Sequence, residues 1–272
     1  MKINRLGMKR LGKRIGNPPG LILYSFCVFV FILLPISMII VFSFNSARNG
    51  VFPLREFTLD WYREVFISAQ IVSAAKASLG VAVSVALLSG VLGTLGSLGL
   101  ARYDFRFKGG VWVLLLMPMI LPPLMLGVSL LTYFHSIGLK PSLLTVIIAQ
   151  TVWAVPYVIF IVYARLRDFD RSIEEAARDL GANRWMTFLR VTFPMISSSI
   201  IGAMMVIFAW SFDDFVVTFF TIGPNPTLPI IIWGMLRTGI TPVLNAIAAM
   251  LFTLTLATML IARQVGRVDI EF

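Results

Sequence analysis

Two adjacent acids, Asp213 and Asp214, lie inside the apolar stretch 195–222. A carboxylate at the centre of a bilayer costs about 2.5–3.5 kcal/mol on insertion scales, and acids placed there are usually functional. Successive helical residues point in different directions, so both acids cannot face one pore. The pair therefore predicts that at least one carboxylate contacts a cationic solute. The alternatives are a structural ion pair with Lys76, Arg237 or another subunit, and an interfacial helix end.

Prolines mark a second candidate for the path of that solute. Pro118, Pro122 and Pro123 fall within the apolar stretch 111–134, and three prolines must kink or break a helix. Backbone carbonyls freed at membrane depth are tolerated only where they face protein or a water-filled cavity. We expect Pro122 and Pro123 to line a pathway, together with Trp210 near the acid pair. Simple kinking is the alternative.

The chain offers no candidate residues for catalysis or for metal binding. Its single cysteine, Cys27, excludes an intramolecular disulfide, and its single histidine, His135, falls in an external loop. One His and one Cys leave almost no material for a zinc site, and no nucleophile–base pair stands out. An intramembrane enzyme is therefore not indicated.

The elements that must position these residues follow from composition. Of 272 residues, 58% are hydrophobic and 13% charged, against about 45–50% and about 25% in soluble domains. A soluble globular domain and a disordered chain are both excluded. Because about 20 mostly apolar residues cross a bilayer, we expect an all-α membrane protein with six transmembrane helices. They fall at 20–44, 71–101, 111–134, 143–163, 195–222 and 243–262.

The basic residues predict the orientation of these helices. Most of the 23 Lys and Arg residues lie in the two tails and in the loops 102–110 and 164–193. By the positive-inside rule, both termini are cytoplasmic. The formal charge of +10 is then a topology signal, and we expect no nucleic-acid partner. The chain divides into a basic cytoplasmic tail (1–19), a six-helix transmembrane domain (20–262) and a second cytoplasmic tail (263–272).

The cytoplasmic loop 164–194 predicts two short amphipathic helices. Ser172, with Glu175 three residues later, forms a capping box that would begin the first helix. Gly181 would end it, Asn183 would cap the second helix, and Pro194 would stop that helix before the fifth span. Small residues along the apolar stripe of the first helix suit close docking of a soluble protein. A helix lying on lipid headgroups is the alternative, although such helices usually have a strongly basic face.

The segment from Glu175 to Pro194 resembles the EAA motif of ABC importer permeases, E-A-A-x3-G-x9-I-x-L-P. Val191 and Phe193 are mild departures from it. The resemblance implies the type I importer permease fold and a coupling helix that fits a cleft on a cytoplasmic ATPase. The residues expected to couple are Glu174, Glu175, Ala176, Ala177, Asp179, Leu180, Gly181 and Ala182.

Over nearly the whole chain, the sequence is similar to spermidine/putrescine permeases, and more so to the second permease subunit of the pair. The similar segments are Ser43-Phe44-Asn45, Asp60-Trp61-Tyr62, Glu175 to Ala182, Asp213-Asp214, Gly223-Pro224 and Leu228-Pro229. The resemblance implies a transmembrane permease subunit of an ATP-driven importer for a small cationic solute, a polyamine. The alternatives are a related importer of another small organic solute and a self-sufficient secondary transporter.

The resemblance also implies partners and a location. A dimer of ABC ATPases would bind ATP and Mg, so this chain would carry no cofactor and would not itself be an enzyme. A second homologous permease, expected to be a different chain, would pair with it around the path. An extracytoplasmic binding protein would deliver the solute. The chain would lie in the bacterial inner membrane as a multi-pass protein in contact with lipid.

Overall fold

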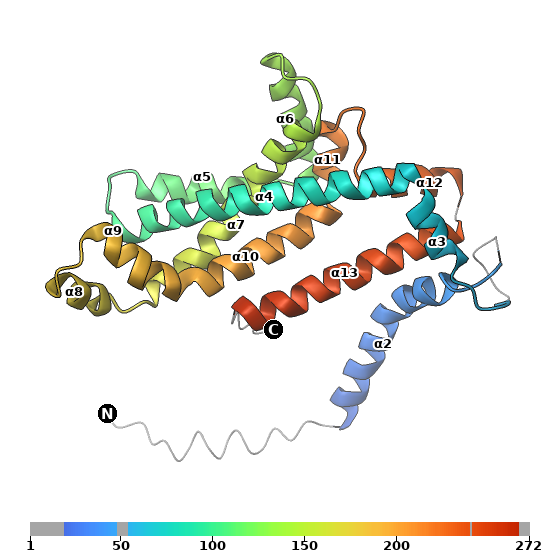
Figure 1. The fold of residues 1–272 in the computed structure, drawn as a ribbon, viewed down its shortest axis with the longest axis horizontal. Helices are drawn as coiled ribbons and strands as arrows, with labels where there is room; N and C mark the ends of the chain where they lie inside the picture. Colours follow the sequence, from blue (N-terminus) through green and yellow to red (C-terminus); the bar gives the residue numbers. More distant parts are fainter. Residues whose placement is uncertain (1–18, 48–53, 240, 267–272) are drawn as a thin grey trace.

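The structure, a computed structural model, describes residues 19–47, 54–239 and 241–266. The tail expected at 1–19 therefore lies, except for Pro19, outside the described residues, as does the end of the tail expected at 263–272. Apart from one isolated bridge between Asn45 and Phe57, every regular element of the described chain is helical (Figure 1). The helices are α2 (Pro19–Phe42), α3 (Asp60–Ile67), α4 (Ala69–Arg102), α5 (Lys108–Ile120), α6 (Pro123–Ser136), α7 (Leu143–Arg167), α8 (Ser172–Asp179), α9 (Arg184–Thr187), a π-helical turn (Phe188–Thr192), α10 (Phe193–Asp213), α11 (Val216–Thr221), α12 (Leu228–Thr238) and α13 (Pro242–Gly266).

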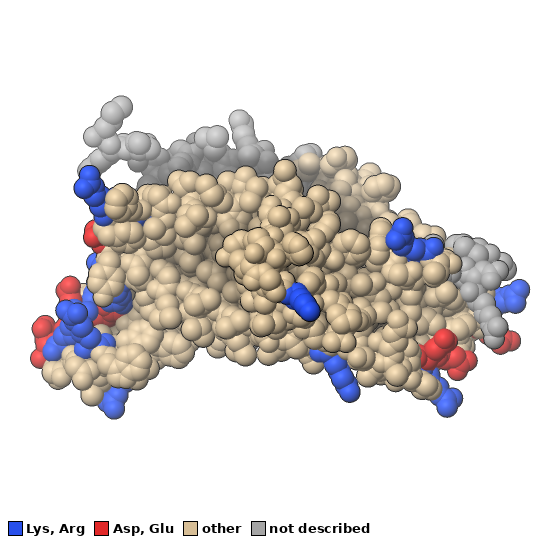
Figure 2. Space-filling view, turned by 90° about the horizontal axis from the view of Figure 1, so that it is seen from above, with Lys and Arg blue, Asp and Glu red and all other residues tan. Residues whose placement is uncertain are grey.

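Five helical runs of the described chain are long and apolar enough to cross a membrane: α2, α4, α7, Arg184–Asp213 and α13. The pair α5 and α6 supplies a sixth candidate, bent by 106° at its break. The all-α, six-span fold expected from the sequence is confirmed when this bent pair is taken as one span. On the face shown in Figure 2, charged side chains gather mostly toward the two ends of the long axis.

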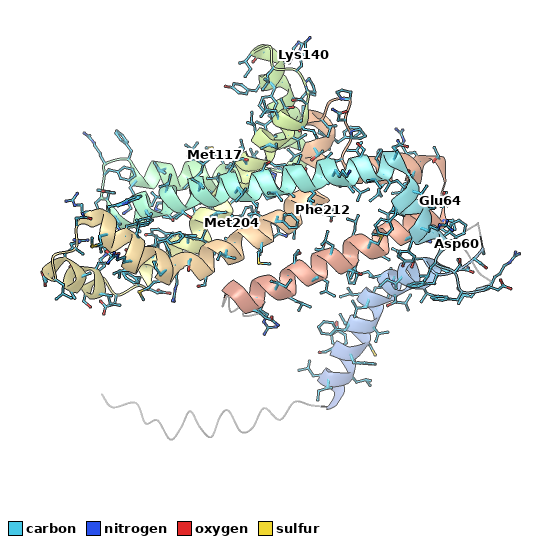
Figure 3. The ribbon with its side chains drawn as sticks, in the orientation of Figure 1. Asp60, Glu64, Met117, Lys140, Met204 and Phe212 are labelled. Carbon is cyan, nitrogen blue, oxygen red and sulfur yellow. The ribbon has the colours of Figure 1, made fainter. Side chains whose placement is uncertain are left out.

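The spans differ in how they pack. Helices α4, α7, α10 and α13 lie along the long axis, whereas α6 projects away from them with α11 beside it (Figure 1). Helix α2 contacts α13 and is otherwise exposed. Figure 3 places Met204 and Phe212 along α10, and Asp60 and Glu64 in α3 at the end of the molecule opposite α8.

Glycines on α4 allow its close packing on α7 and α10. A Cβ on Gly93 would lie 2.6 Å from Val158 Cβ, and one on Gly90 would lie 2.6 Å from Met204 Sδ. Neither position has room for a larger residue without a shift. The small residues at these two sites therefore allow the neighbouring helices to approach closely.

The prolines of the third span break it, as expected. Pro118 lies inside α5, the chain turns at Leu121 and Pro122, and Pro123 begins α6. Pro122 has an extended backbone, which suits a residue that precedes another proline.

Pro194 does not stop the helix before the fifth span, so that prediction is wrong. The chain runs from α9 through the π-helical turn into α10, with Pro194 in the first turn of α10. The Phe193 N–H donates to the Phe188 carbonyl, five residues earlier. A wider turn accommodates a proline because it relieves the contact of the ring with the preceding carbonyls.

The apolar stretch 195–222 and the proline-rich segment that follows it are each divided between elements. The stretch 195–222 is not one helix, because α10 ends at Asp213 and the short α11 begins at Val216. Within the proline-rich segment 223–229, Leu228 and Pro229 form the first turn of α12. A proline there loses no hydrogen bond, since the first N–H groups of a helix have no internal acceptor.

Candidate functional site

A cavity of about 250 Å³ lies where the α5–α6 break meets α7, α10 and α11. We call it the aromatic cavity. Its lining residues are Pro118, Met119, Leu121, Pro123, Leu126, Trp153, Tyr157, Trp210, Asp214 and Val217. The proline break thus forms one wall and the end of α10 forms another.

Three aromatic rings meet in this cavity. The Tyr157 and Trp210 rings lie 5.0 Å apart and nearly perpendicular, at 83°. The Trp153 ring lies 6.2 Å from that of Tyr157 and 6.3 Å from that of Trp210. Their faces provide negative quadrupoles, which attract cations within about 6 Å of a ring. The cavity therefore combines aromatic faces with one carboxylate, that of Asp214.

Neutral groups hold the Asp214 carboxylate. Its Oδ2 accepts from the Thr218 N–H at 2.9 Å, from the Thr218 hydroxyl at 2.8 Å and from Gln150 Nε2 at 3.2 Å. Gln150 is itself fixed by Thr218 and by the hydroxyl of Ser211. These bonds orient the side chain across the break between α10 and α11, and they leave acceptor capacity on Oδ1, since a carboxylate has about four lone-pair sites.

The predicted path residues are only partly brought together. Asp214, Trp210 and Pro123 line the aromatic cavity, whereas Pro122 and Asp213 are not among its lining residues. Asp213 is exposed at the last turn of α10.

A structural ion pair was the alternative reading of the two acids. Among the described residues, neither Asp213 nor Asp214 forms a salt bridge, with Lys76, Arg237 or any other residue. The other alternative was that the two acids mark a helix end. This is correct in part, because α10 ends at the acid pair and Asp214 accepts the N–H of Thr218 in α11.

Three important side chains were missed by sequence reasoning. Gln150, Trp153 and Tyr157 lie on α7 at intervals of three and four residues, so they share one face of that helix. A polar and aromatic stripe on an otherwise apolar span was the signal that could have identified them.

The expected coupling residues lie at the other end of α10, in and after α8. Helix α8 begins at Ser172, but its hydroxyl does not cap it, so the predicted capping box with Glu175 is wrong. The carboxylate of Asp170 instead accepts the Ser172 N–H at 2.9 Å. Asp170 precedes α8, so its side chain can bond to the first N–H group of that helix.

The end of α8 and the start of α9 follow the sequence prediction. Gly181 has φ +89°, and the Ala182 N–H donates to the Ala177 carbonyl at 3.1 Å, which is the pattern of a helix closed by a left-handed glycine. The Asn183 side chain accepts the Met186 N–H at 2.8 Å and caps α9.

Most of the α8 surface is open to a partner. Leu180 is 91% exposed, and Ile173, Glu175, Ala176 and Asp179 are exposed as well. Glu174 is different, because its side chain is only 2% exposed.

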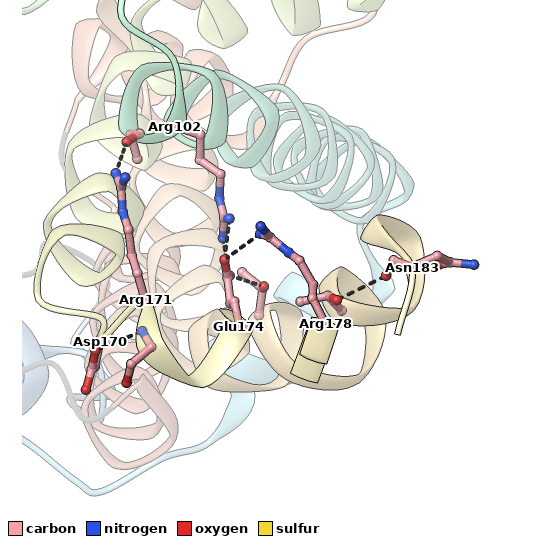
Figure 4. Close-up of polar contacts among 10 residues, drawn as sticks. Arg102, Asp170, Arg171, Glu174, Arg178 and Asn183 are labelled. Carbon is pink, nitrogen blue, oxygen red and sulfur yellow. Dashed lines mark hydrogen bonds and ion pairs between the residues drawn. The ribbon is translucent and has the colours of Figure 1, made fainter. Parts of the chain in front are cut away.

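Glu174 points inward to an arginine of α4. The two terminal nitrogens of the Arg102 guanidinium donate to the two carboxylate oxygens of Glu174, and the hydroxyl of Thr192 donates to Oε1 (Figure 4). Arg178 Nη2 lies 3.6 Å from Oε2. Burial raises the pKa of the Glu174 carboxyl, but the bonds from Arg102 and Thr192 and the nearby charges outweigh it and hold that pKa below its ordinary value.

Residues 90–268 match the family of binding-protein-dependent transport system inner membrane components. The chain belongs to this family. The spermidine/putrescine permease PotC of Haemophilus influenzae is 31% identical to it over 245 residues, 90% of this chain and 95% of the relative. The putrescine permease PotI of Escherichia coli is 35% identical over 231 residues, 82% of each chain.

Solved structures of ABC importers share the fold. A bacterial transporter that imports the acidic polysaccharide alginate matches with a TM-score of 0.70 over 96% of this chain and all of the matched chain, at 16% identity. The family and the apolar helices together make this chain a multi-pass inner membrane permease, a transport component rather than an enzyme.

Proposed function

We propose that this chain is a permease subunit of an ATP-driven importer of polyamines such as spermidine and putrescine. The observation that carries the substrate class is the aromatic cavity with Asp214, an acid without a basic partner among the described residues. Its three neutral hydrogen bonds keep it oriented without neutralising it. A cationic ligand would supply the missing charge.

The chemistry of a polyamine suits this cavity. A polyamine alternates ammonium groups with short methylene chains, so it needs carboxylates and aromatic faces in turn. Ammonium groups bind carboxylates and ring faces, and methylene groups pack against Trp153, Tyr157 and Trp210. The volume of about 250 Å³ suits a slender chain or one end of it.

The fold alone does not fix the charge of the substrate. The structure with TM-score 0.70 belongs to an importer of an acidic polysaccharide, whereas the curated relatives are named for polyamines. Asp214 favours a polyamine over an acidic polysaccharide, because an uncompensated carboxylate repels an anion. The sequence relatives and the cavity chemistry thus support the same proposal.

The proposal includes an orientation and a set of partners. Both termini and the loop with α8 would be cytoplasmic, as the basic residues predict. The exposed surface of α8 would enter a cleft on an ABC ATPase, and the ATPase dimer would bind ATP and Mg. A second, different permease would complete the path, and an extracytoplasmic binding protein would deliver the polyamine. Residues 20–262 would form the permease domain between the two tails.

The test is uptake of radiolabelled spermidine by cells that express the complete transporter and lack other polyamine importers. Asp214→Asn keeps the size of the side chain and removes its charge. Uptake should fall about 10- to 150-fold, as expected when a charged hydrogen-bond partner of about 1.5–3 kcal/mol is lost. Assembly is checked by co-purification of the ATPase.

Asp213→Asn is the matched control, because it removes the same charge one residue away from the cavity lining. We expect a fall of less than about threefold. Wild-type uptake by Asp214→Asn would contradict the assignment of the cavity. Spermidine uptake by the wild-type transporter without ATP hydrolysis would contradict the importer class.

A further inference from the structure

Helix α8 is attached to the spans mainly through side chains. It has eight residues and packs on α9 and the π-helical turn. Two arginine side chains link this region to α4, one from α4 itself and one from the residue before α8. Arg102 of α4 donates to Glu174 of α8, and Arg171 Nη2, just before α8, donates to the Ala101 carbonyl of α4 at 2.7 Å (Figure 4).

These contacts occupy both carboxylate oxygens of Glu174, and its buried side chain is not accessible to a docking protein. Both of its oxygens accept from Arg102, Oε1 also accepts from Thr192, and Arg178 approaches Oε2. Its side chain is 2% exposed, whereas Glu175 beside it is exposed. The two adjacent glutamates of the loop therefore face different partners: Glu174 faces the spans, and Glu175 faces outward.

The third member of this contact lies where α10 begins. Thr192 is the last residue of the π-helical turn and is 1% exposed. From there α10 runs without a break to Asp213, next to Asp214 of the aromatic cavity. Helix α4 packs along α7, which carries Trp153 and Tyr157 of the same cavity. The Glu174 carboxylate thus joins α8 to α10, which ends beside the cavity, and to α4, which packs on the helix that carries two of the cavity's rings.

We propose that Arg102, Glu174 and Thr192 form a clasp that transmits a displacement of α8 to α4 and α10. They are positioning residues, and the inference rests on the proposed function. Without the clasp, the short connections 168–171 and 180–183 on either side of α8 would absorb the displacement. A bidentate pair of guanidinium and carboxylate fixes both distance and orientation, so it suits transmission better than a single contact.

The test compares uptake with ATP hydrolysis in the purified complete transporter, reconstituted in vesicles with its binding protein. Glu174→Gln keeps the shape of the side chain but loses the charge-assisted bonds. The expected result is a fall of about 2- to 30-fold in spermidine imported per ATP hydrolysed, the range that residues on a coupling route typically show. Co-purification of the ATPase should be unchanged. A merely structural role would lower assembly and leave this ratio intact.

Two further variants keep the test decisive if Glu174→Gln assembles poorly. Thr192→Val removes only the hydroxyl bond and should lower the ratio, whereas Thr192→Ser should retain it. Asp104→Asn is the matched control, because it breaks an ion pair with Lys108 that begins in the loop after α4 and includes no residue of the clasp.

The outcomes separate this inference from the proposed function. If the wild-type transporter imports no spermidine with ATP, the proposed function fails. If the wild type imports spermidine and both Glu174→Gln and Thr192→Val keep the wild-type ratio, the clasp is overturned and the proposed function stands. If Asp104→Asn lowers the ratio as much as they do, the effect is not specific to the clasp and the inference is also overturned.

Discussion

Glu174 and Asp214 are acids held at opposite ends of α10, and they differ in the charge of their partners. Glu174 is bound by Arg102 and approached by Arg178, so its charge is compensated within the chain. Asp214 is held by Gln150 and Thr218, which are neutral. The bidentate pair with Arg102 fixes the position of Glu174 relative to α4, whereas the neutral partners of Asp214 leave room for a cationic ligand to compensate its charge. In the two proposals above, this difference separates a mechanical site from a recognition site.

The largest effect on stability should come from removing the cation of the compensated acid. Arg102→Met leaves the buried Glu174 carboxylate with Thr192 and a distant Arg178. We expect a loss of about 2–4 kcal/mol of unfolding free energy, below the full cost for a buried pair because the Arg102 side chain is 30% exposed. Denaturant unfolding of the purified transporter measures it.

Lys108→Met is the control for that change. It also removes a cation from an ion pair near the same end of the molecule, but Asp104 is almost fully exposed. We expect no measurable loss of stability. An equal loss in both variants would mean that the burial of Glu174 has no special role.

A smaller effect should follow from disturbing the neutral partners of Asp214. Gln150 is 1% exposed, and Gln150→Leu would leave the Ser211 hydroxyl without its acceptor, whereas Thr218 would keep its bonds to Asp214. We expect a loss of about 1–3 kcal/mol of stability and reduced spermidine uptake, because Asp214 would also lose one of the bonds that orient it. Thr151→Val, on the same helix but bonded only to the Ile147 carbonyl, should have little effect on uptake. Equal uptake by the two variants would contradict the role of Gln150.

The aromatic faces should matter next. Trp210→Leu should lower spermidine uptake about 2- to 30-fold, which corresponds to a cation–π contribution of about 0.5–2 kcal/mol, and Trp210→Phe should lower it less. Trp185→Leu, at the other end of the molecule and 68% exposed, should not change how uptake depends on substrate charge. If Trp210→Phe and Trp210→Leu lose uptake equally, the ring face does not bind the cation.

The smallest effect should be the pH dependence of the clasp. The pKa of Glu174 is held below its ordinary value of 4.5, so its contribution to stability is complete well above that pH and is lost as pH falls through the lower, folded-state pKa. The difference in Tm between wild type and Glu174→Gln should stay constant from about pH 8 to about pH 5.5 and shrink below pH 4.5. A difference that shrinks already near neutral pH would contradict the pairing with Arg102.

Local patterns predicted the spans, the break at the prolines and the glycine that ends α8, because each depends on residues close in sequence. They missed the inward direction of Glu174, since its partner Arg102 is 72 residues away. They also missed Gln150, which reaches Asp214 across 64 residues. The stop at Pro194 failed because a π-helical turn accommodated the proline. The roles of the coupling residues and path residues stay predictions until variants are measured.

The most direct test of the account is the uptake of spermidine relative to N-acetylspermidine, which carries one charge fewer. Because every variant is measured with the same binding protein, a change in this ratio between variants reports how the permease recognises charge. We predict that Asp214→Asn lowers the ratio, whereas Glu174→Gln lowers the uptake of both compounds by the same factor and leaves the ratio unchanged. A ratio that changes in Glu174→Gln, or one that stays at the wild-type value in Asp214→Asn, would contradict the division of roles between the two acids.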